Sequence, residues 1–419
     1  MIDNSLYNKY KALKEKLNYT YKGYNLQHLI PGYLNYIFAG ENPSARDVAK
    51  EFYVGLKSID FRKMFDMDTP VIISYLIERS DYRDLANAAK EQCPRAEVVG
   101  LFVLPKVSFS PFRFYYLKHF LKAFGLVFSR SLASGFMTKL YLVALITKLF
   151  NQIRLINKVE NYSHIKQYVC FNSAYKEESL ITEFFNRRNV ETISLQHGIF
   201  CDFKLLIPFD YINFDNLLAQ KVLCWGQSTI DYLKAKGIDR SRLILAGNPK
   251  YKDVKIDATR IDRSFTRCLV LLGRGIYTKT NDKLLALLKE YNDKHKDNKI
   301  LFYLKKHPFL LDSDHKSFAS VDNNMIFIGK EHSVQEVLRS DLVNFTISVN
   351  TTAYYESLAL GKISLRWAEF ENEEFFGMDD KFEDLSGFEE KLSLYRQMPA
   401  EKIKEEIENV IRYVFNPQL

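Results

Sequence analysis

The sequence is built from short apolar runs, each of which ends in a polar or glycine turn and is followed by a segment of helical length. Runs of this length and setting are typical of buried parallel strands that are joined by crossover helices. In the first half of the chain they are Val71–Leu76, Val98–Leu104, Tyr168–Phe171, Val190–Leu195 and Val222–Trp225. In the second half they are Cys268–Leu272, Ile300–Leu304, Met325–Ile328, Leu342–Ile347 and Ile363–Leu365. The pattern predicts an α/β protein with two doubly wound, Rossmann-like units.

The charged segment Lys250–Arg267 separates the two blocks and is the expected domain boundary. A chain of 419 residues, 47% of them hydrophobic, is long enough to bury two cores. We expect residues 1–255 to form the first domain and residues 266–419 the second. Two amphipathic helices are predicted at the end, Phe382–Tyr395 and Ala400–Phe415, of which the last would pack back across the boundary.

A helical insertion is expected around 109–160, because Phe112–Val159 is rich in Phe, Leu, Tyr and Val. Basic residues interrupt this stretch, so none of its apolar runs is long enough to cross a bilayer. Phe136–Leu155 predicts an apolar helix edged with positive charge, which would lie in the headgroup region of an anionic membrane. Ordinary helices that cover the first sheet are the alternative interpretation.

Charge and cysteine content restrict the cellular setting. The 59 basic and 51 acidic residues give a net charge of +8, a modest excess rather than the dense basic stripe of a nucleic-acid binder. Five widely spaced cysteines without a CxxC pair are expected to be reduced thiols. Met1–Tyr24 lacks the apolar core of a signal peptide. We therefore expect a cytoplasmic protein, and a peripheral position on the inner face of the cytoplasmic membrane stays open.

The polar residues directly after the strands are the candidate site residues, because open α/β sheets bind ligands beyond the carboxyl ends of their strands. The first group is Gln196-His197-Gly198, after Val190–Leu195. An imidazole at a strand end, with a glycine behind it that allows a sharp turn, can take a proton from a substrate hydroxyl near neutral pH. His197 is the candidate general base, and a histidine that is merely hydrogen-bonded at a domain interface is the alternative.

Two further groups fit phosphate. Lys305-Lys306-His307-Pro308 follows Ile300–Leu304, and its cationic groups can donate to phosphate oxygens and offset charge on a departing nucleotide, while Pro308 fixes the turn. A solvated basic loop is the alternative. Gly273-Arg274-Gly275 follows Cys268–Leu272, where the glycines allow close backbone approach and the arginine offers a planar fork. Its spacing matches neither a dinucleotide fingerprint nor a P-loop.

The last group is Ser348-Val349-Asn350-Thr351-Thr352, after Leu342–Ile347. Hydroxyl and amide side chains at the start of a helix are good N-caps, and the N–H groups of the first helical turn can bind an anion. Glu356 lies one turn past Thr352, where a carboxylate could accept hydrogen bonds from ribose hydroxyls. Capping alone is the alternative interpretation of this group.

Taken together, "SLQHGIF", "CWGQSTIDYLKAKGI", "LILAGNPKY", "LKKHP" and "SVNTTAYYESLALGK" resemble GT-B transferases of bacterial envelope polymers, over about Tyr168 to Trp367. Similar families are capsule and O-antigen glycosyltransferases, sialyl- and polysialyltransferases, and teichoic-acid glycerophosphotransferases. The resemblance implies an acceptor on the first domain, a nucleotide donor on the second, a cleft between them, and no obligatory metal or other cofactor. The acidic motif of bacterial sialyltransferases is not evident in the first half, which disfavours that subclass.

Carried over to this sequence, the resemblance implies His197 as the base and Glu356 near the ribose. It places His307, Lys306, Ser348, Thr351 and Thr352 at the donor phosphates, while Gly247 and Asn248 match a motif at the interdomain turn. The hypothesis is a metal-independent glycosyltransferase of surface-polysaccharide biosynthesis. Its partners would be a nucleotide sugar, a saccharide or lipid-linked oligosaccharide acceptor, and an anionic membrane surface.

Two alternatives stay open. Transfer of an alditol phosphate from CDP-glycerol or CDP-ribitol needs the same base and basic pocket but makes a phosphodiester. A non-catalytic protein that binds a nucleotide sugar or polysaccharide would not require a positioned base. Asp66-Met67-Asp68 and Asp312-Ser313-Asp314 have DxD spacing, but neither follows a strand, so no metal site is predicted. Nucleic-acid binding is disfavoured because the basic residues are interleaved with acids.

Overall fold

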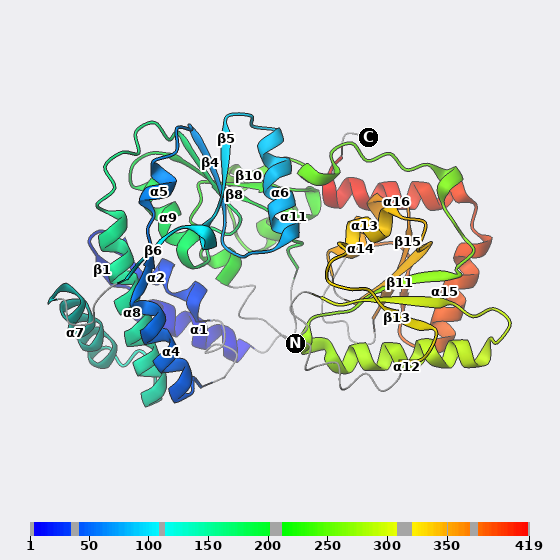
Figure 1. Ribbon diagram of the computed structural model, residues 1–419, viewed down its shortest axis with the longest axis horizontal. Helices are drawn as coiled ribbons and strands as arrows, with labels where there is room; N and C mark the ends of the chain where they lie inside the picture. The colour runs from blue at the N-terminus through cyan, green and yellow to red at the C-terminus, as the bar shows by residue number, and fades with distance from the viewer. Residues whose placement is uncertain are drawn as a thin grey trace. The chain divides into compact units, whose positions relative to one another are not determined.

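The computed structural model describes residues 4–34, 42–108, 114–201, 212–307, 321–349, 351–368 and 376–417. Two six-stranded sheets dominate this part of the chain, and every strand pair within them is parallel (Figure 1). Helices precede and follow the strands in alternation. The predicted α/β class with two doubly wound units is therefore confirmed.

The first sheet has the strand order β10-β9-β8-β7-β4-β5. Its strands are β4 Val71–Tyr75, β5 Ala96–Gly100, β7 Gln167–Cys170, β8 Glu191–Leu195, β9 Lys221–Cys224 and β10 Leu243–Leu245. β5 begins two residues before the predicted run Val98–Leu104. It also ends earlier than that run, because Leu101–Val103 forms a 3-10 turn. Strand addition reverses direction between the neighbours β4 and β7, and ligands of such sheets bind at this switch point, beyond the carboxyl ends of the strands.

The second sheet has the order β13-β12-β11-β14-β15-β16. Its strands are β11 Arg267–Leu271, β12 Leu301–Lys305, β13 Met325–Phe327, β14 Phe345–Ser348, β15 Ile363–Trp367 and β16 Lys381–Phe382. Counted from β11, this is the order 3-2-1-4-5-6 of the Rossmann fold, and its switch point lies between β11 and β14. β16 was not predicted, since a two-residue strand carries no periodic signal.

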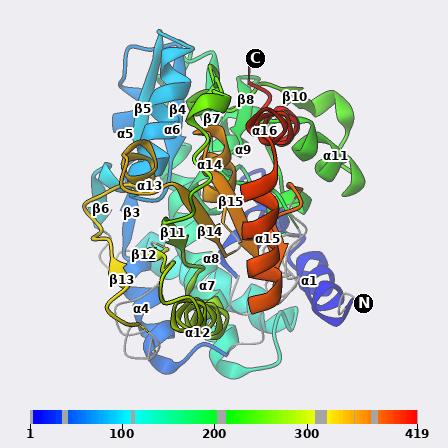
Figure 2. The ribbon, with the colours of Figure 1, turned by 90° about the vertical axis from the view of Figure 1, so that its right-hand side faces the viewer.

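Helices surround both sheets. Those before β10 are α1 Asn4–Lys16, α2 Leu26–Leu29, α4 Ala45–Gly55, α5 Arg62–Phe65, α6 Ser80–Glu91, α7 Phe114–Ser129, α8 Phe136–Ile156, α9 Lys176–Asn186 and α11 Gln227–Ala235. Those after β11 are α12 Thr278–Lys294, α13 Val334–Arg339, α14 Ala353–Ala359, α15 Leu385–Gln397 and α16 Ala400–Phe415. α12 packs on α15, and α14 packs on α16 (Figure 2). Both predicted terminal helices are confirmed, and Asn416, in a left-handed conformation, ends α16.

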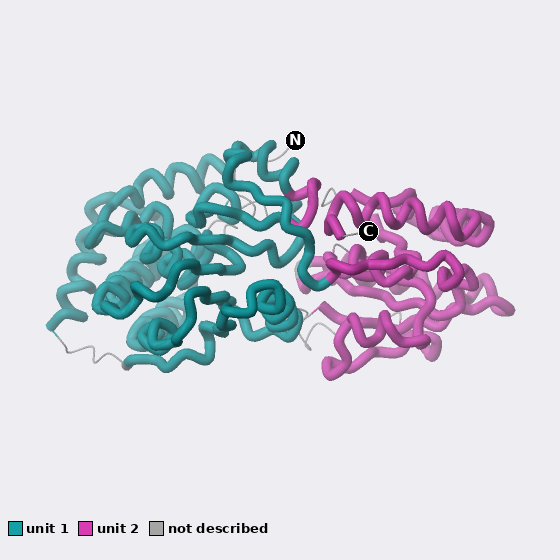
Figure 3. Tube along the Cα trace, turned by 90° about the horizontal axis from the view of Figure 1, so that it is seen from above, with its two compact units in different colours: residues 1–224, 230–250 teal, residues 225–229, 251–419 magenta. Residues whose placement is uncertain are grey.

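The chain divides into two compact units, shown in separate colours in Figure 3. Unit 1 contains Met1–Cys224 and Ile230–Lys250, and unit 2 contains Trp225–Thr229 and Tyr251–Leu419. The short segment after β9 belongs to unit 2 because it packs on α16. The Trp225 ring contacts that of Phe415 at 5.6 Å, and a Cβ on Gly226 would lie 2.3 Å from the Tyr413 carbonyl oxygen.

Helices α7 and α8 occupy the region of the predicted insertion and pack against each other. From Thr138 on, α8 is largely buried, and its side chains at Leu142, Val143, Ile146, Phe150 and Ile153 have no exposed surface. The expectation that Phe136–Leu155 lies in a membrane headgroup region is therefore wrong from Thr138 on, where the helix is a core element held between α4 and α7, and its alternative, an ordinary covering helix, holds there. Within the described ranges, we find no helix that is both long and apolar enough to span a bilayer.

Candidate active site

His197 lies in the turn after β8, next to β7 at the switch point of the first sheet. Gln196, which is buried, closes the turn by donating from Nε2 to the Gly198 carbonyl at 2.9 Å. The His197 Nδ1 atom is 3.0 Å from the carbonyl oxygen of Phe171, the first residue after β7. A carbonyl oxygen can only accept, so Nδ1 carries the proton and Nε2 holds the lone pair. The structure thus orients the imidazole as a proton acceptor.

Burial lowers the pKa of His197 from its ordinary value of 6.5 to about 4. The bond to the Phe171 carbonyl opposes this shift, and the positive charge of Arg79 adds to it. Aromatic rings form the surroundings, with Phe171 stacked at 5.9 Å and Tyr82 edge-on at 5.4 Å. The Arg79 guanidinium in turn lies 4.5 Å from the Tyr82 ring centre. At pH 7 the imidazole is therefore neutral and in its base form.

Glu178, in the first turn of α9, positions this histidine indirectly. Its Oε1 accepts a hydrogen bond from the Phe171 N–H at 3.0 Å, and its Oε2 accepts one from the Asn172 N–H at 3.3 Å. Phe171 is thus fixed on both sides, by the carboxyl group through its N–H and by His197 through its carbonyl. Burial raises the pKa of Glu178 to about 8. The sequence did not single out this residue, because an acid in the first turn of a helix is accounted for by the helix dipole.

A cavity of about 420 Å³ opens at the same edge of the first sheet. Leu76 and Ile77 line it and directly follow β4, so the cavity lies at the switch point. The ring of Tyr75, one residue earlier, contacts the ring of Phe171 at 5.8 Å. The other lining residues are Gly32, Tyr33, Glu51, Val54, Tyr141, Lys148, Tyr175, Lys176 and Glu177.

The cavity wall holds a cluster of buried charges. Lys148 Nζ lies 3.5 Å from Glu177 Oε1 and 3.9 Å from Glu51 Oε1. Glu177 Oε1 also accepts from Gln152 Nε2 at 3.2 Å, whereas Glu51 Oε1 accepts no hydrogen bond from the described residues. Burial raises the pKa of Glu51, and Lys148 opposes that rise. These groups come from α4, α8 and α9, which lie far apart in the chain, so no sequence motif could predict that they form a cluster.

In unit 2, the structure brings three predicted groups to one edge of the second sheet. Leu271 of β11 pairs with Lys305 of β12 on one side and with Ser348 of β14 on the other, so the three strands end at the same level. The described residues that follow are Gly273-Arg274-Gly275, Lys306-His307, Val349 and Thr351 to Glu356. They meet at the switch point between β11 and β14.

The Gly273 turn packs directly against the loop after β14. A Cβ on Gly273 would lie 3.0 Å from Val349 Cγ1 and 3.1 Å from Tyr277 Cβ, which leaves little room for any other residue. Asn281 of α12 holds the turn by accepting from the Gly273 N–H at 2.9 Å and donating to its carbonyl at 3.2 Å. Half-buried Arg274 lies between this glycine and the 3-10 turn Gly275–Tyr277.

The basic residues at the end of β12, Lys305 and Lys306, contact different partners. Lys305 donates to the carbonyls of Gly329 and His332, at 2.6 and 2.5 Å, and so ties β12 to the end of β13. Lys306 Nζ lies 4.8 Å from the centre of the Phe327 ring. His307 is half-buried, and the predicted Pro308 lies outside the described residues.

The group after β14 caps α14 only in part. Ser348 is buried, and its hydroxyl donates to the Leu365 carbonyl at 3.4 Å. Thr352 occupies the N-cap position but makes no side-chain cap bond, whereas Thr351 Oγ1 accepts from the Ala353 N–H at 3.3 Å. The predicted Asn350 lies outside the described residues.

Glu356 faces Tyr251, just past the end of unit 1. Burial and the negative charge of Glu356 raise the pKa of Tyr251, whose hydroxyl also accepts from Gln335 Nε2 at 2.9 Å.

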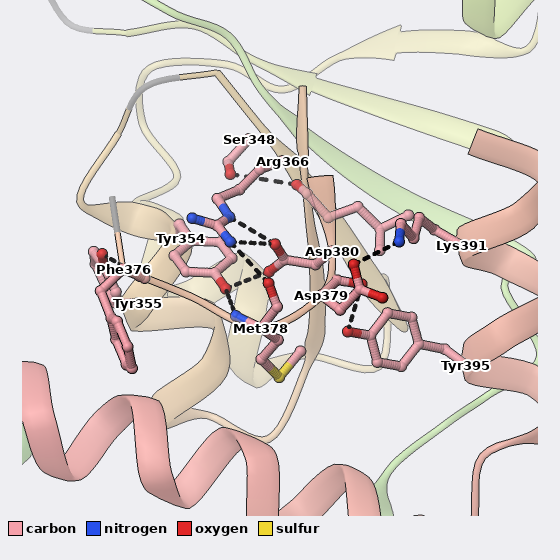
Figure 4. A network of polar contacts seen from close by, with 11 residues as sticks. Ser348, Tyr354, Tyr355, Arg366, Phe376, Met378, Asp379, Asp380, Lys391 and Tyr395 are labelled. Carbon is pink, nitrogen blue, oxygen red and sulfur yellow. Dashed lines mark hydrogen bonds and ion pairs between the residues drawn. The ribbon is translucent and has the colours of Figure 1, made fainter. Parts of the chain in front are cut away.

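A buried polar network anchors α14 and the carboxyl end of β15 (Figure 4). Arg366 Nη2 lies 2.6 Å from Asp380 Oδ1, and the Tyr354 hydroxyl of α14 donates to the same carboxylate. Tyr354 also accepts from the Met378 N–H at 3.2 Å. Burial raises the pKa of Asp380 to about 6, and the guanidinium opposes the rise. The network fixes the helix that carries Glu356.

Among the described residues, no group of three or more His, Cys, Asp or Glu side chains is arranged to hold a metal ion. Asp66 ends the short helix α5 and does not follow a strand. The second DxD, Asp312 to Asp314, lies outside the described residues.

No protein family and no curated protein matches this chain. Solved structures with a similar backbone include Staphylococcus aureus MnaA with UDP, at 9% identity and a TM-score of 0.48 over 82% of this chain and 91% of that one. UDP-GlcNAc 2-epimerase from Neisseria meningitidis bound to UDP-GlcNAc matches at 10% and 0.46, over 82% and 98%. The lipopolysaccharide outer core galactosyltransferase WaaB matches at 9% and 0.44, over 83% and 95%. These likenesses are weak, and the fold class stated above follows from the strand orders alone.

Proposed function

We propose that this protein is a nucleotide-sugar-dependent glycosyltransferase of bacterial surface-polysaccharide biosynthesis, cytoplasmic and peripheral on the inner face of the membrane. The observation that carries the proposal is the bond from His197 Nδ1 to the Phe171 carbonyl. It fixes a neutral imidazole with its Nε2 lone pair at the switch point of a sheet, where ligands of α/β folds bind. A base in that place is what the removal of a proton from an acceptor hydroxyl requires.

The cavity beside β4 supports unit 1 as the acceptor side. Sugar hydroxyls both donate and accept, and the wall offers carboxylates at Glu51 and Glu177 and an ammonium group at Lys148. Tyr33, Tyr141 and Tyr175 add rings that suit the apolar faces of a sugar. The Glu51 oxygen that accepts no hydrogen bond from the described residues would gain one from a bound hydroxyl.

The strand-end groups of unit 2 support a donor site there. Lys306, His307 and Arg274 would donate to the two phosphates, and the hydroxyls of Thr351 and Thr352 would add to them. Gly273 and Gly275 let the backbone approach closely, and Glu356 would accept from the ribose. The two cationic side chains Lys306 and Arg274 can balance charge on the leaving nucleotide and His307 can donate a hydrogen bond to it, so the proposal needs no metal or other cofactor.

In the proposed reaction, the acceptor oxygen forms a bond to the anomeric carbon while the bond from that carbon to the phosphate oxygen breaks. The acceptor proton moves to His197 Nε2, and the nucleotide leaves with the bonding electron pair. General-base help contributes about 10²–10⁴-fold, and a donor aimed at developing charge about 10²–10³-fold. The mechanism predicts that His197 and His307 face one shared cleft.

The test is turnover of the purified protein with UDP-, GDP-, CMP- and CDP-activated donors on saccharide and lipid-linked acceptors. We expect a new glycosidic bond, and a loss of at least about 10²-fold in His197→Ala and in His307→Ala. His164→Ala is the matched control, since His164 is also half-buried and also bonds a backbone carbonyl, that of Met67 at 2.9 Å, but precedes β7.

Other results of this assay would favour an alternative function or remove the base assignment. A new phosphodiester would assign alditol-phosphate transfer from a CDP-activated donor. Nucleotide binding without turnover of any donor would assign a non-catalytic binding protein. Full turnover in His197→Ala would remove His197 as the base.

A further inference from the structure

Helix α7 exposes one apolar face. Phe114, Leu117, Leu121 and Phe124 are 82%, 49%, 59% and 40% exposed, and their spacing of three and four residues places them on one side of the helix. The opposite side, including Tyr116, His119 and Ala123, is buried, and α7 packs on α8. Large apolar side chains that are scattered singly on a surface are ordinary, but a contiguous row of them marks an interaction site.

The row continues onto the start of α8. Phe124 stacks on Phe128 at 4.3 Å, and Phe128 contacts Phe136 at 6.4 Å. Phe136 and its neighbour Met137 are 62% and 40% exposed, unlike the rest of α8. We call the exposed residues Phe114, Leu117, Leu121, Phe124, Phe136 and Met137 the α7 patch.

The stretch of sequence that contains the α7 patch carries charge of a single sign. No Asp or Glu occurs between Glu97 and Glu160, whereas nine basic residues do: Lys106, Arg113, Lys118, Lys122, Arg130, Lys139, Lys148, Arg154 and Lys158. They exceed the net charge of +8 of the whole chain, so the remainder of the protein carries no basic excess. Lys118, Lys122 and Arg130 are exposed on α7 or at its end, and Lys139 Nζ lies 5.3 Å from the Phe128 ring.

This combination selects one partner. Basic side chains around an apolar face suit an anionic bilayer, because the apolar groups enter the boundary of the acyl chains while the ammonium and guanidinium groups meet lipid phosphates. A second copy of this chain would bring two strongly basic segments together and is disfavoured by repulsion. We propose that the α7 patch docks the protein on the surface of an anionic lipid bilayer. The inference stands independently of the transfer reaction.

The experiment is co-sedimentation of the full-length protein with vesicles of phosphatidylcholine alone and of phosphatidylcholine with phosphatidylglycerol. We expect binding to the anionic vesicles only, weakened as ionic strength rises. Leu117→Asp/Leu121→Asp should reduce binding to the anionic vesicles by at least tenfold. Lys118→Glu should reduce both that binding and its dependence on salt concentration. These side chains are exposed, so the variants should keep the wild-type melting temperature.

Ile326→Asp is the matched control, since Ile326 is 45% exposed but lies on β13 of unit 2. It should bind vesicles like the wild type. Equal binding to both vesicle types, or wild-type binding by Leu117→Asp/Leu121→Asp, would overturn the proposal. A lack of binding to both vesicle types would also overturn the proposal. If the protein then self-associated, and Leu117→Asp/Leu121→Asp abolished that self-association, the patch would be assigned to a second copy of this chain. No nucleotide or acceptor enters the assay, so its result is separate from that of the turnover test.

Discussion

At the scale of single residues, one hydrogen bond decides what His197 can do. With Nδ1 donating to Phe171, the ring has one tautomer and one free lone pair, and Glu178 holds the Phe171 N–H on the other side. The same aromatic packing that orients the ring also shields it from part of the solvent, which disfavours the imidazolium. Orientation and a low pKa therefore arise from one local structure.

The pH dependence of turnover follows from this environment. The base form of His197 is lost only as the pH falls through about 4, so kcat/KM should show no decline through 6.5, the ordinary pKa of histidine. The measurement is a kcat/KM profile between pH 4 and 8, together with circular dichroism to verify folding at each pH. An acid limb centred near 6.5 would contradict the assignment.

The pH dependence of the free energy of unfolding should also reflect the protonation of His197. The unfolded chain takes up the proton near pH 6.5 and the folded chain only near 4, so His197 lowers the free energy of unfolding as the pH falls through this window. Urea unfolding of His197→Gln should therefore show a smaller loss between pH 6.5 and 4.5 than the wild type. An identical pH dependence of the two proteins would mean that the imidazole is not buried in its neutral form.

Gly273 provides a second test at this scale. An added Cβ meets Val349 and Tyr277 at 3.0 and 3.1 Å, so Gly273→Ala should cost about 1–3 kcal/mol in the free energy of unfolding. Gly125→Ala is the control: its Cβ would meet nothing within 4 Å in the interior of α7, and the change should stabilise by about 0.5–1 kcal/mol. Equal effects of the two substitutions would show that the turn after β11 is loosely packed.

At the scale of elements, the network around Arg366 and Asp380 decides how firmly α14 is held. The two side chains are 9% and 0% exposed and link β15 to the segment before β16, while Tyr354 connects them to the helix. A buried ion pair is costly to break, because the remaining charge has no water to solvate it.

Arg366→Met should therefore lower the free energy of unfolding by about 3–5 kcal/mol, whereas Arg366→Met/Asp380→Asn should recover part of the loss by removing the orphaned charge. The control is Lys90→Ala, which breaks the pair with Glu97, whose side chains are 37% and 52% exposed, and should cost less than about 1 kcal/mol. Urea midpoints with unchanged m-values are the readout. A double variant that is less stable than the single one would contradict this account.

The elements also show what the sequence could predict. Strands such as β8 and β11 were predicted because short apolar runs that end in a polar turn and alternate with segments of helical length are typical of buried parallel strands. The candidate site residues were named because they follow those runs. The cavity was missed because Glu51, Lys148 and Glu177 belong to three distant helices. Phe136–Leu155 was misread because a buried helix and an interfacial helix share an apolar composition, and only packing shows that α7 carries the exposed face.

At the scale of the whole molecule, the two units differ in chemistry. Unit 1 offers a neutral imidazole and a cavity with carboxylates, whereas the sheet edge of unit 2 offers Arg274, Lys306 and His307. An anionic nucleotide should therefore bind unit 2, and a neutral polyol should bind unit 1.

This division predicts where a nucleotide protects the chain from hydrogen exchange. UDP, GDP, CDP and CMP would first be screened by thermal shift, since a ligand at about 100 times its Kd adds roughly 2.7 kcal/mol of apparent stability. With the best of them bound, exchange should slow most in peptides covering 272–281, 305–307 and 351–360, because the phosphates and ribose order those turns. Lys306→Ala should weaken both the thermal shift and the protection, whereas Lys118→Ala, an equally positive residue on α7, should leave both unchanged. Protection greatest around 171–178 and 196–201 would place the nucleotide on unit 1 and reverse the assignment of donor and acceptor sides.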